Sequence, residues 1–247
     1  MRLMLLNGNT SQAMTDRLMA AARGIVAPGT ELIPVTARLG PAVIASRAAY
    51  AIAGHAVLDA YAAHRDTKPD AIVLACFGDP GLLALREISG LPCFGMAEAG
   101  CLAAARMAAR FSIVTGGEKW GPMLTEYAAG LGLAERLASV RVLQADGGQI
   151  GADPLAARDA IYQAARLAVK EDGAELVVLG GAGMVGQIEP LATRFQAEGL
   201  NLPVIDGLTP AIEMAEAAAA AKPAAAANQR VPVQTIGLSE ALAGLLK

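Results

Sequence analysis

The chain reads Asp70-Ala-Ile-Val-Leu-Ala-Cys-Phe-Gly-Asp-Pro-Gly81 in one stretch and Glu175-Leu-Val-Val-Leu-Gly-Gly-Ala-Gly-Met184 in another. Each stretch is a short apolar run that ends in a turn of small residues and leads into a helical pattern. Aligned with each other, the two stretches place Cys76 over Gly181, 105 positions further along the chain (181 − 76). The pattern predicts two copies of one unit that face a shared site, and only one copy carries a thiol.

Two further matches support an internal duplication. The run that ends at Asn7 resembles the run that ends at Thr115, 108 positions later (115 − 7). The pair Leu91-Pro92 is repeated as Leu202-Pro203 after 111 positions (202 − 91). A repeat of this length is too long for a solenoid, so we expect two similar lobes.

We expect the chain to cross to the second lobe near Met96 and to return near Gly207. The first lobe then comprises residues 1–96 together with 208–247, and the second comprises residues 97–207. The tail after the return is expected to pack back on the first lobe.

Short runs rich in β-forming residues end at Gly, Asn, Asp or Pro, and Ala/Leu/Arg segments with helical spacing separate most of them. The alternation predicts an α/β fold built from mainly parallel sheets flanked by helices. The expected strands are Leu3–Leu6, Glu31–Val35, Ala71–Ala75, Pro92–Gly95, Phe111–Thr115, Ser139–Leu143, Leu176–Leu179 and Pro203–Ile205.

Capping residues mark the starts of several helices. A Thr10-Ser11 cap precedes the expected helix Gln12–Val26, and Asp153 precedes Pro154–Lys170. Near the end, Lys222-Pro223 interrupts an alanine-rich helix. We expect Val231–Gly237 to be a strand or extended segment, followed by a short helix from Ser239.

Composition excludes several classes of protein. The chain of 247 residues is 54% hydrophobic and 17% charged, which suits strands buried between Ala-rich helices. Its net charge of −3 and lack of a basic stripe argue against nucleic acid as a partner. No apolar run is long enough to span a bilayer, and the N-terminal run breaks too early for a signal peptide. We therefore expect a cytoplasmic protein that acts on a small molecule, with apolar helices suited to a homo-oligomer.

Cys76 is the candidate reactive group. It ends a predicted parallel strand, at the edge where open α/β sheets bind ligands. A helix that starts nearby would favour its thiolate through the helix dipole, although a free cysteine is more often a small core residue. Cys93 and Cys101 fit the core, and the spacing of the three fits neither a metal site nor a disulfide framework. His55 and His64 share one helical segment that nothing directs at Cys76, so a Cys–His hydrolase is weakly supported.

The second stretch also contains a G-x-G-x-x-G motif, Gly181-Ala-Gly183-Met-Val-Gly186, with Asp206 twenty residues beyond. This is the spacing of a dinucleotide-binding turn. However, too little chain follows for a nucleotide-binding domain, and the duplication explains the same glycines. A dinucleotide site is the less favoured interpretation.

Polar turns follow the first strand of each predicted lobe, as Asn7-Gly-Asn-Thr-Ser11 and Thr115-Gly116-Gly117. Both turns would lie at the sheet edge of Cys76, where their polar groups suit carbonyl or carboxylate oxygens. For Asn7 we favour a role in binding, whereas ordinary turn and cap chemistry explains the others equally well.

With these residues the chain resembles the aspartate/glutamate/hydantoin racemase superfamily, and most of all its hydantoin and allantoin racemases. The resemblance covers nearly the whole chain. It is carried by Asn7–Ser11, Gly40-Pro41, Cys76–Leu82, Pro92–Ala99, Phe111–Thr115 and Leu179–Met184. It implies two pseudo-symmetric α/β lobes with the active site in the cleft between them. It also implies proton transfer by one cysteine from each lobe, without metal, PLP or nicotinamide.

In this resemblance Cys76 matches the first cysteine, and Gly181 replaces the second. Inversion needs a proton donor on both faces of the substrate carbon, and glycine supplies none. A 5-substituted hydantoin, allantoin or an amino-acid-like compound is the implied substrate. Two alternatives stay open: a single-cysteine lyase or decarboxylase of the same superfamily, and a homologue that only binds a small molecule.

The other expected site residues would bind the substrate around Cys76. Turn amides at Phe77, Gly78, Ala182 and Gly183 would hold the enolate oxygens. Asn7, Thr115 and Gly116 would position the substrate beside Gly181. Asp79 is expected to orient the turn or touch a substrate N–H, although helix capping explains it as well.

Overall fold

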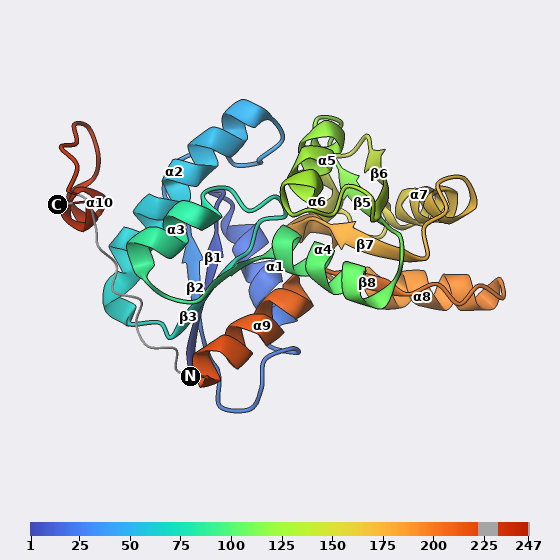
Figure 1. Ribbon diagram of the computed structural model, residues 1–247, viewed down its shortest axis with the longest axis horizontal. Coiled ribbons are helices and arrows are strands. Elements are labelled where there is room, and N and C mark those ends of the chain that lie inside the picture. The colour runs from blue at the N-terminus through green and yellow to red at the C-terminus, as the bar shows by residue number, and fades with distance from the viewer. Residues whose placement is uncertain (222–231, 247) are drawn as a thin grey trace.

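The computed structural model describes residues 1–221 and 232–246 and contains two four-stranded parallel sheets, one in each lobe (Figure 1). The first sheet has the order β2-β1-β3-β4 and the second β6-β5-β7-β8. The strands are β1 (Arg2–Asn7), β2 (Glu31–Thr36), β3 (Ala71–Leu74), β4 (Cys93–Gly95), β5 (Phe111–Gly116), β6 (Leu137–Leu143), β7 (Leu176–Gly180) and β8 (Val204–Asp206). All eight expected strands are present, and the expected fold class is confirmed.

The two sheets share one register as well as one strand order. Leu6 of β1 pairs with Leu74 of β3, and the residues 108 and 105 positions later, Val114 and Leu179, pair in the same way. On the other side of β3, Leu74 pairs with Gly95, just as Leu179 pairs with Asp206. The offsets read from the sequence are therefore the offsets of the paired strands, which is the pattern of a duplicated unit.

Helices cover both sheets. They are α1 (Gln12–Ala22), α2 (Arg47–His64), α3 (Leu82–Ser89), α4 (Met96–Met107), α5 (Trp120–Gly130), α6 (Gly147–Ala152), α7 (Arg158–Lys170), α8 (Ile188–Ala197), α9 (Leu208–Ala220) and α10 (Glu240–Leu245), with 3-10 turns η1 (Arg65–Thr67) and η2 (Ala182–Met184). Serines begin three of them: Ser11, Ser46 and Ser239 each accept a hydrogen bond from a backbone amide of the first turn.

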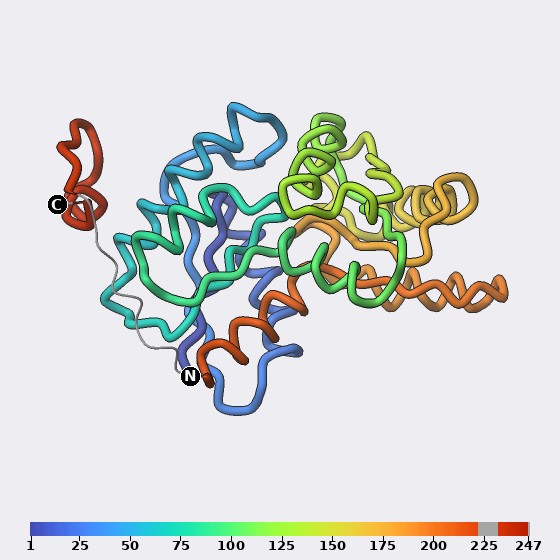
Figure 2. Tube along the Cα trace, in the orientation of Figure 1, coloured from blue at the N-terminus to red at the C-terminus, as the bar shows by residue number. Residues whose placement is uncertain are grey.

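Two helices cross between the lobes. Helix α4 follows the first sheet but packs against β7 and β8, whereas α9 follows the second sheet and packs against β3 and β4. The chain therefore passes from one lobe to the other twice, in the green segment before α4 and the orange segment before α9 (Figure 2). The helices also contact each other, and a Cβ atom at Gly207 would lie 2.1 Å from the carbonyl oxygen of Met96. This close approach needs glycine and fixes the lobes together.

The main hydrophobic core is continuous between the lobes. It contains Leu5 and Val73 from the first sheet, Ile113 and Val178 from the second, and buried residues of the crossing helices such as Ala99. Strands that are buried on both faces explain the apolar runs in the sequence. A core shared in this way holds the cleft between the sheets in one shape.

Some boundaries differ from those expected. Helix α1 ends at Ala22 because the chain turns through Arg23–Val26 toward β2. Residues 154–157 form turns, in which the Asp153 carboxylate accepts from Ala156 N, so α7 begins only at Arg158. Residues 232–237 form no strand. The Lys222-Pro223 interruption lies outside the described residues.

The tail packs on the first lobe through its last helix. Helix α10, which begins after Ser239 as expected, lies against α2 and buries Leu242 and Leu245. In the part of the chain that the structure describes, no helix is both long and apolar enough to cross a membrane.

Candidate active site

A cavity of about 90 Å³ lies between the carboxyl ends of strands from both sheets. This is the edge at which open parallel sheets bind their ligands. The first lobe lines it with Asn9, Ser11, Met14, Ala42–Ile44 and Ala75–Phe77. The second lobe lines it with Thr115, Gly116, Trp120, Gly147, Gly148, Ile150 and Gly180–Met184.

The uncharged character of this cavity limits its chemistry. Among the described residues that line it, none has a side chain charged at neutral pH, and Cys76 is the one with a titratable group. Apolar walls with a few hydrogen-bonding groups suit a neutral, polar small molecule. A free carboxylate would find no cationic partner in these walls.

Cys76 lies two residues beyond the end of β3 and is buried, with 8% of its surface exposed. Its carbonyl oxygen accepts a hydrogen bond from Asp79 N, 3.0 Å away, which closes the turn. Burial raises the pKa of the Cys76 thiol, and the nearby Asp79 carboxylate raises it further. The expectation that a helix dipole would lower this pKa was wrong, because α3 begins only at Leu82 and burial dominates.

Gly181 faces the same cavity from the second lobe, at the end of β7. Its φ of +140° lies in a region that residues with side chains rarely adopt. A Cβ atom there would meet nothing within 4 Å. The absence of a side chain therefore leaves open space on the side of the cavity that Gly181 lines.

Backbone amides from both lobes are available near the cavity. Among the described residues, none accepts a hydrogen bond from the N–H groups of Phe77, Ala182 or Gly183, all of which line the cavity. The N–H of Gly78 also has no acceptor in the described chain, but Gly78 lies outside the cavity wall. Free amides of this kind can hold oxygen atoms that carry negative charge.

Phe77 joins the two lobes beside the cavity, and Thr115 supports the second lobe at the same place. The ring of Phe77 packs so close to Gly180 that a Cβ atom at position 180 would lie 2.9 Å from Phe77 Cε1. The Thr115 hydroxyl donates to the Gly180 carbonyl oxygen at 2.6 Å. The Phe77 contact ties the turn after β3 to the end of β7, whereas the Thr115 hydrogen bond lies within the second lobe and joins β5 to β7.

Asn7 does not line the cavity, although it was expected to position the substrate. Its side chain is fully buried, and its amide nitrogen donates to Asn9 Oδ1, Ser11 O and Thr15 Oγ1. Asn7 instead orders the loop that brings Asn9 and Ser11 to the cavity wall. Asn9 Nδ2 has no acceptor within the described chain, so it can donate to a bound carbonyl group.

The loop between β2 and α2 covers the cavity through Ala42, Val43 and Ile44. Trp120 of α5 lines the cavity too and donates its indole N–H to the carbonyl oxygen of Ile44 at 3.0 Å. Its ring meets Tyr50 edge-on. Sequence analysis did not predict that this loop covers the cavity. The one signal was the position of the single tryptophan, just after Thr115-Gly116-Gly117.

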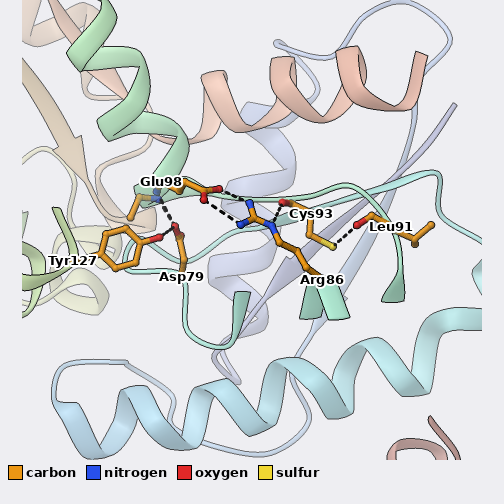
Figure 3. A network of polar contacts seen from close by, with 7 residues as sticks. Asp79, Arg86, Leu91, Cys93, Glu98 and Tyr127 are labelled. Atoms are coloured by element: carbon orange, nitrogen blue, oxygen red, sulfur yellow. Dashed lines mark hydrogen bonds and ion pairs between the residues drawn. The ribbon is translucent and has the colours of Figure 1, made fainter. Parts of the chain in front are cut away.

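Asp79 also lies away from the cavity wall. Its buried carboxylate accepts from Ala97 N at 3.0 Å, Glu98 N at 2.7 Å and the Tyr127 hydroxyl at 2.6 Å. Figure 3 shows Tyr127 and the first turn of α4 converging on it. The capping interpretation of Asp79 thus agrees with its contacts, and the cap is that of α4.

The glycine motif lacks the setting of a dinucleotide site. Such a site needs a helix that begins at the motif, but here a short 3-10 turn follows β7 and α8 begins only at Ile188. Asp206 accepts from Thr209 N and so caps α9. Gly183 is required because a Cβ atom would lie 2.2 Å from the carbonyl oxygen of Gly147.

The structure brings most of the expected site residues together. Cys76, Phe77, Thr115, Gly116, Gly181, Ala182 and Gly183 line the cavity, whereas Asn7, Gly78 and Asp79 support it from behind. Cys93 lies in β4 and Cys101 in α4, and both are buried in the core. His55 and His64 lie on α2 and do not line the cavity.

Comparison with known proteins agrees with this geometry. The model of the family Asp/Glu/Hydantoin racemase matches residues 3–215. A hydantoin racemase from Paenarthrobacter aurescens is 39% identical over 217 residues, which are 87% of this chain and 90% of that protein. A hydantoin racemase from Pseudomonas sp. (strain NS671) is 33% identical over 216 residues, covering 87% and 85%.

Solved structures give the same picture. Allantoin racemase from Pseudomonas fluorescens superposes with a TM-score of 0.89 at 30% identity, over 96% of this chain and all of that chain. Allantoin racemase from Klebsiella pneumoniae gives 0.88 at 32% identity, over 98% of each chain. Arylmalonate decarboxylase shares the fold, with a TM-score of 0.58 at 16% identity, over 92% of this chain and 96% of that chain.

Proposed function

The chain belongs to the Asp/Glu/hydantoin racemase family, and we propose that it moves a proton at the carbon α to a carbonyl group of a small neutral molecule, with Cys76 as acid and base. The relatives are named as racemases, which are isomerases, and the chain is an enzyme of that family. The proposed substrates are 5-substituted hydantoins and allantoin.

The observation that carries this proposal is the position of the Cys76 thiol in an uncharged cavity. The carbon acid of a hydantoin is flanked by a carbonyl group within a neutral ring. Such a ring needs hydrogen-bond partners rather than a counter-charge, and Asn9 and Ser11 line the cavity with side-chain donors. Free amides of Phe77, Ala182 and Gly183 are suited to the ring oxygens.

The proposed reaction begins in the minority of molecules whose Cys76 thiol has released its proton to water, and this thiolate takes the α-proton. The C–H bond breaks, its electron pair moves onto the carbonyl oxygen, and the amide groups stabilise the charge that develops there. The thiol exchanges this proton with water and then returns a solvent-derived proton to the same face of the carbon, so the α-proton is exchanged without inversion of the carbon. The exchange needs no metal ion or organic cofactor.

Inversion requires a proton from the other face, and Gly181 cannot donate one. We propose that a water molecule entering the open space beside Gly181 supplies it. The water gives its proton to the enolate, and the resulting hydroxide recovers a proton from the Cys76 thiol. Because water is a weaker acid than a thiol, inversion by this route should be slower than exchange.

Decarboxylation is a second candidate, and the protonation state of Cys76 favours it. Burial raises the pKa of this thiol, so the proton needed to quench an enolate after loss of CO₂ is already present. Against this, a malonate carries two charges, and no cationic side chain among the described residues lines the cavity. We therefore rank proton exchange first.

The proposal is tested with L-5-benzylhydantoin and allantoin in D₂O, by following α-deuterium with NMR, and with phenylmalonate, by following CO₂ release. Deuterium uptake by the wild type that is lost in Cys76→Ala supports the proposal. CO₂ release without deuterium uptake would favour the decarboxylase instead. If neither reaction is accelerated while the hydantoin still binds in a calorimetric titration, the protein is a binding homologue and the catalytic proposal is wrong.

A further inference from the structure

The two crossing helices are capped in different ways. Helix α9 is capped by the residue at the end of its own strand, because Asp206 accepts from Thr209 N at 2.8 Å. The matching position before α4 is Gly95, which has no side chain to do this. Asp79, from the turn that carries Cys76, caps α4 in its place.

The Asp79 carboxylate occupies the space that a side chain at Gly95 would need. A Cβ atom at Gly95 would lie 2.1 Å from Asp79 Cγ. Asp79 adopts a φ of +55°, which Asp and Asn tolerate better than most residues with a side chain. In the second lobe the position that corresponds to Asp79 is Met184 (79 + 105), so the Gly181 turn has no such tie. Of the two equivalent turns, only the one that carries the thiol therefore caps a crossing helix.

The partners of Asp79 are themselves held in place. Glu98, whose amide donates to Asp79, forms a two-pronged ion pair with Arg86 of α3, and Arg86 also donates to the carbonyl oxygen of Cys93 (Figure 3). Tyr127 belongs to α5 in the second lobe. The turn is thus tied to two helices that are packed into the rest of the fold.

We propose that Asp79 is a positioning residue for Cys76: its carboxylate anchors the thiol-bearing turn to the first turn of α4 and to Tyr127. This inference rests on the proposed role of Cys76. Asp79 does not line the cavity, so it acts through Cys76 rather than on the substrate.

Several titratable groups face this pair. Asp79 is surrounded by Tyr127 of α5 and Glu98 of α4, and its charge acts on Cys101 of α4 and on Tyr50 of α2. Cys76 is influenced by Asp79 and in turn acts on Tyr50. Burial raises the pKa of Asp79 to about 6, against the opposing hydrogen bonds from Tyr127, Ala97 and Glu98. The pKa values of Tyr50 and Tyr127 are raised, so both phenols stay neutral around pH 6.

The charge of Asp79 gives Cys76 a distinctive pH profile. Below about pH 6 the rate at which Cys76 reacts with methyl methanethiolsulfonate should rise tenfold per pH unit, because the fraction of thiolate rises tenfold per pH unit. As Asp79 ionises, the pKa of the thiol rises and the plot of rate against pH flattens. Once Asp79 is fully ionised, the rate rises tenfold per pH unit again. We expect the rates on the limb above this pH to lie about three- to tenfold below the extrapolated lower limb. Mass spectrometry of the Cys76 peptide measures these rates.

Asp79→Asn should remove the inflection and leave one straight limb. A substitution that only loosened the turn would change the reaction rate at every pH by the same factor and would keep the inflection. In α-exchange of L-5-benzylhydantoin the same variant has two opposing effects, because it increases the thiolate fraction but releases the turn from α4. We expect loss of the anchor to dominate, so kcat should fall about tenfold to a hundredfold with KM changed less than about twofold. A KM effect alone would contradict a positioning role.

Tyr127→Phe is the second variant, for the case that Asp79→Asn does not fold. Loss of the phenol removes a hydrogen bond that lowers the Asp79 pKa, so the inflection should move to higher pH. Tyr50→Phe is the matched control. Its hydroxyl donates to the carbonyl oxygen of Gly78 in the same turn, at 2.8 Å, and makes no hydrogen bond to Asp79, so its inflection should stay in place.

The inference is overturned if Asp79→Asn keeps the inflection, or if Tyr127→Phe leaves it where the wild type has it. Thiol reactivity is measured without substrate, so it is independent of the proposed function. A wild type that shows the inflection but exchanges no α-proton would defeat the proposed function while leaving the coupling of Asp79 to Cys76 intact.

Discussion

Cys76 lies two residues beyond Leu74 of β3, and Gly181 lies two residues beyond Leu179 of β7, so they occupy the same position in two copies of one sheet, and both line one cavity. Pseudo-symmetry would place a second acid–base group where Gly181 lies. The chemical asymmetry of the site is therefore a difference at one residue within a symmetric frame.

Gly181→Cys should add inversion to the proton exchange. A side chain at this position has open space, so the thiol would enter the cavity from the second lobe. The φ of +140° makes any side chain there strained, at a cost of about 1–3 kcal/mol in unfolding free energy. We expect loss of optical rotation to become at least about tenfold faster than in the wild type.

The matched control is Gly181→Ala, which carries the same backbone strain without a thiol. It should lose as much stability in a denaturant titration and gain no inversion. Equal inversion rates in the two variants would show that strain, and not the thiol, had changed the reaction.

Gly180→Ala should impair both catalysis and stability. The added Cβ would lie 2.9 Å from both Phe77 Cε1 and Ile113 Cγ2, so the Phe77 ring, and Cys76 beside it, must shift. We expect a drop in kcat of about tenfold or more, and a destabilisation of about 1–3 kcal/mol from overpacking. Unchanged kcat at reduced stability would show that Phe77 does not set the position of Cys76. Gly130→Ala is the control for a glycine-to-alanine change without a steric clash, because the added Cβ there has open space, and it should leave kcat unchanged.

Trp120→Phe should weaken substrate binding. It removes the hydrogen bond from the indole to the carbonyl oxygen of Ile44, which holds the loop over the cavity. A net contribution of about 1 kcal/mol corresponds to a rise in KM of about fivefold, with a smaller effect on kcat. Steady-state kinetics on one hydantoin enantiomer decides this, and an unchanged KM would mean that the loop needs no such tether.

Asp79 should make folding less favourable as pH rises from about 4 to about 6. Burial raises its pKa to about 6 in the folded state, so the unfolded chain ionises first and is stabilised relative to the folded one. Above about pH 6 the difference stays constant, at about 2–3 kcal/mol. The difference in unfolding free energy between the wild type and Asp79→Asn, measured by denaturant titration, should therefore change across this pH window. A difference independent of pH would contradict the buried, ionising carboxylate.

Local sequence patterns predicted the parts of the fold that local chemistry determines. Each strand is an apolar run that ends in turn-forming residues, and the repeat offsets around Cys76, Asn7 and Leu91 match the register of the sheets. The family resemblance and the two-lobed α/β fold were confirmed. The exchange of α4 and α9 between lobes was anticipated only as a crossover near Met96 and a return near Gly207.

Long-range contacts account for what sequence analysis missed. Nothing near Val43 or Ile44 in the chain shows that Trp120 will hold them over the cavity. Asn7 looked like a binding residue because it ends a strand, yet its partners Ser11 and Thr15 turn it inward. The raised pKa of Cys76 depends on burial, which a motif alone does not reveal.

The most direct measurement compares two rates on one sample of L-5-benzylhydantoin in D₂O with the wild-type protein. NMR gives the rate of α-deuterium uptake, and polarimetry gives the rate of inversion. One-face transfer by Cys76 predicts that deuterium enters at least about ten times faster than rotation is lost, because the Gly181 face has only water as a donor. Equal rates would contradict this account, since they would require a second acid–base group as effective as Cys76.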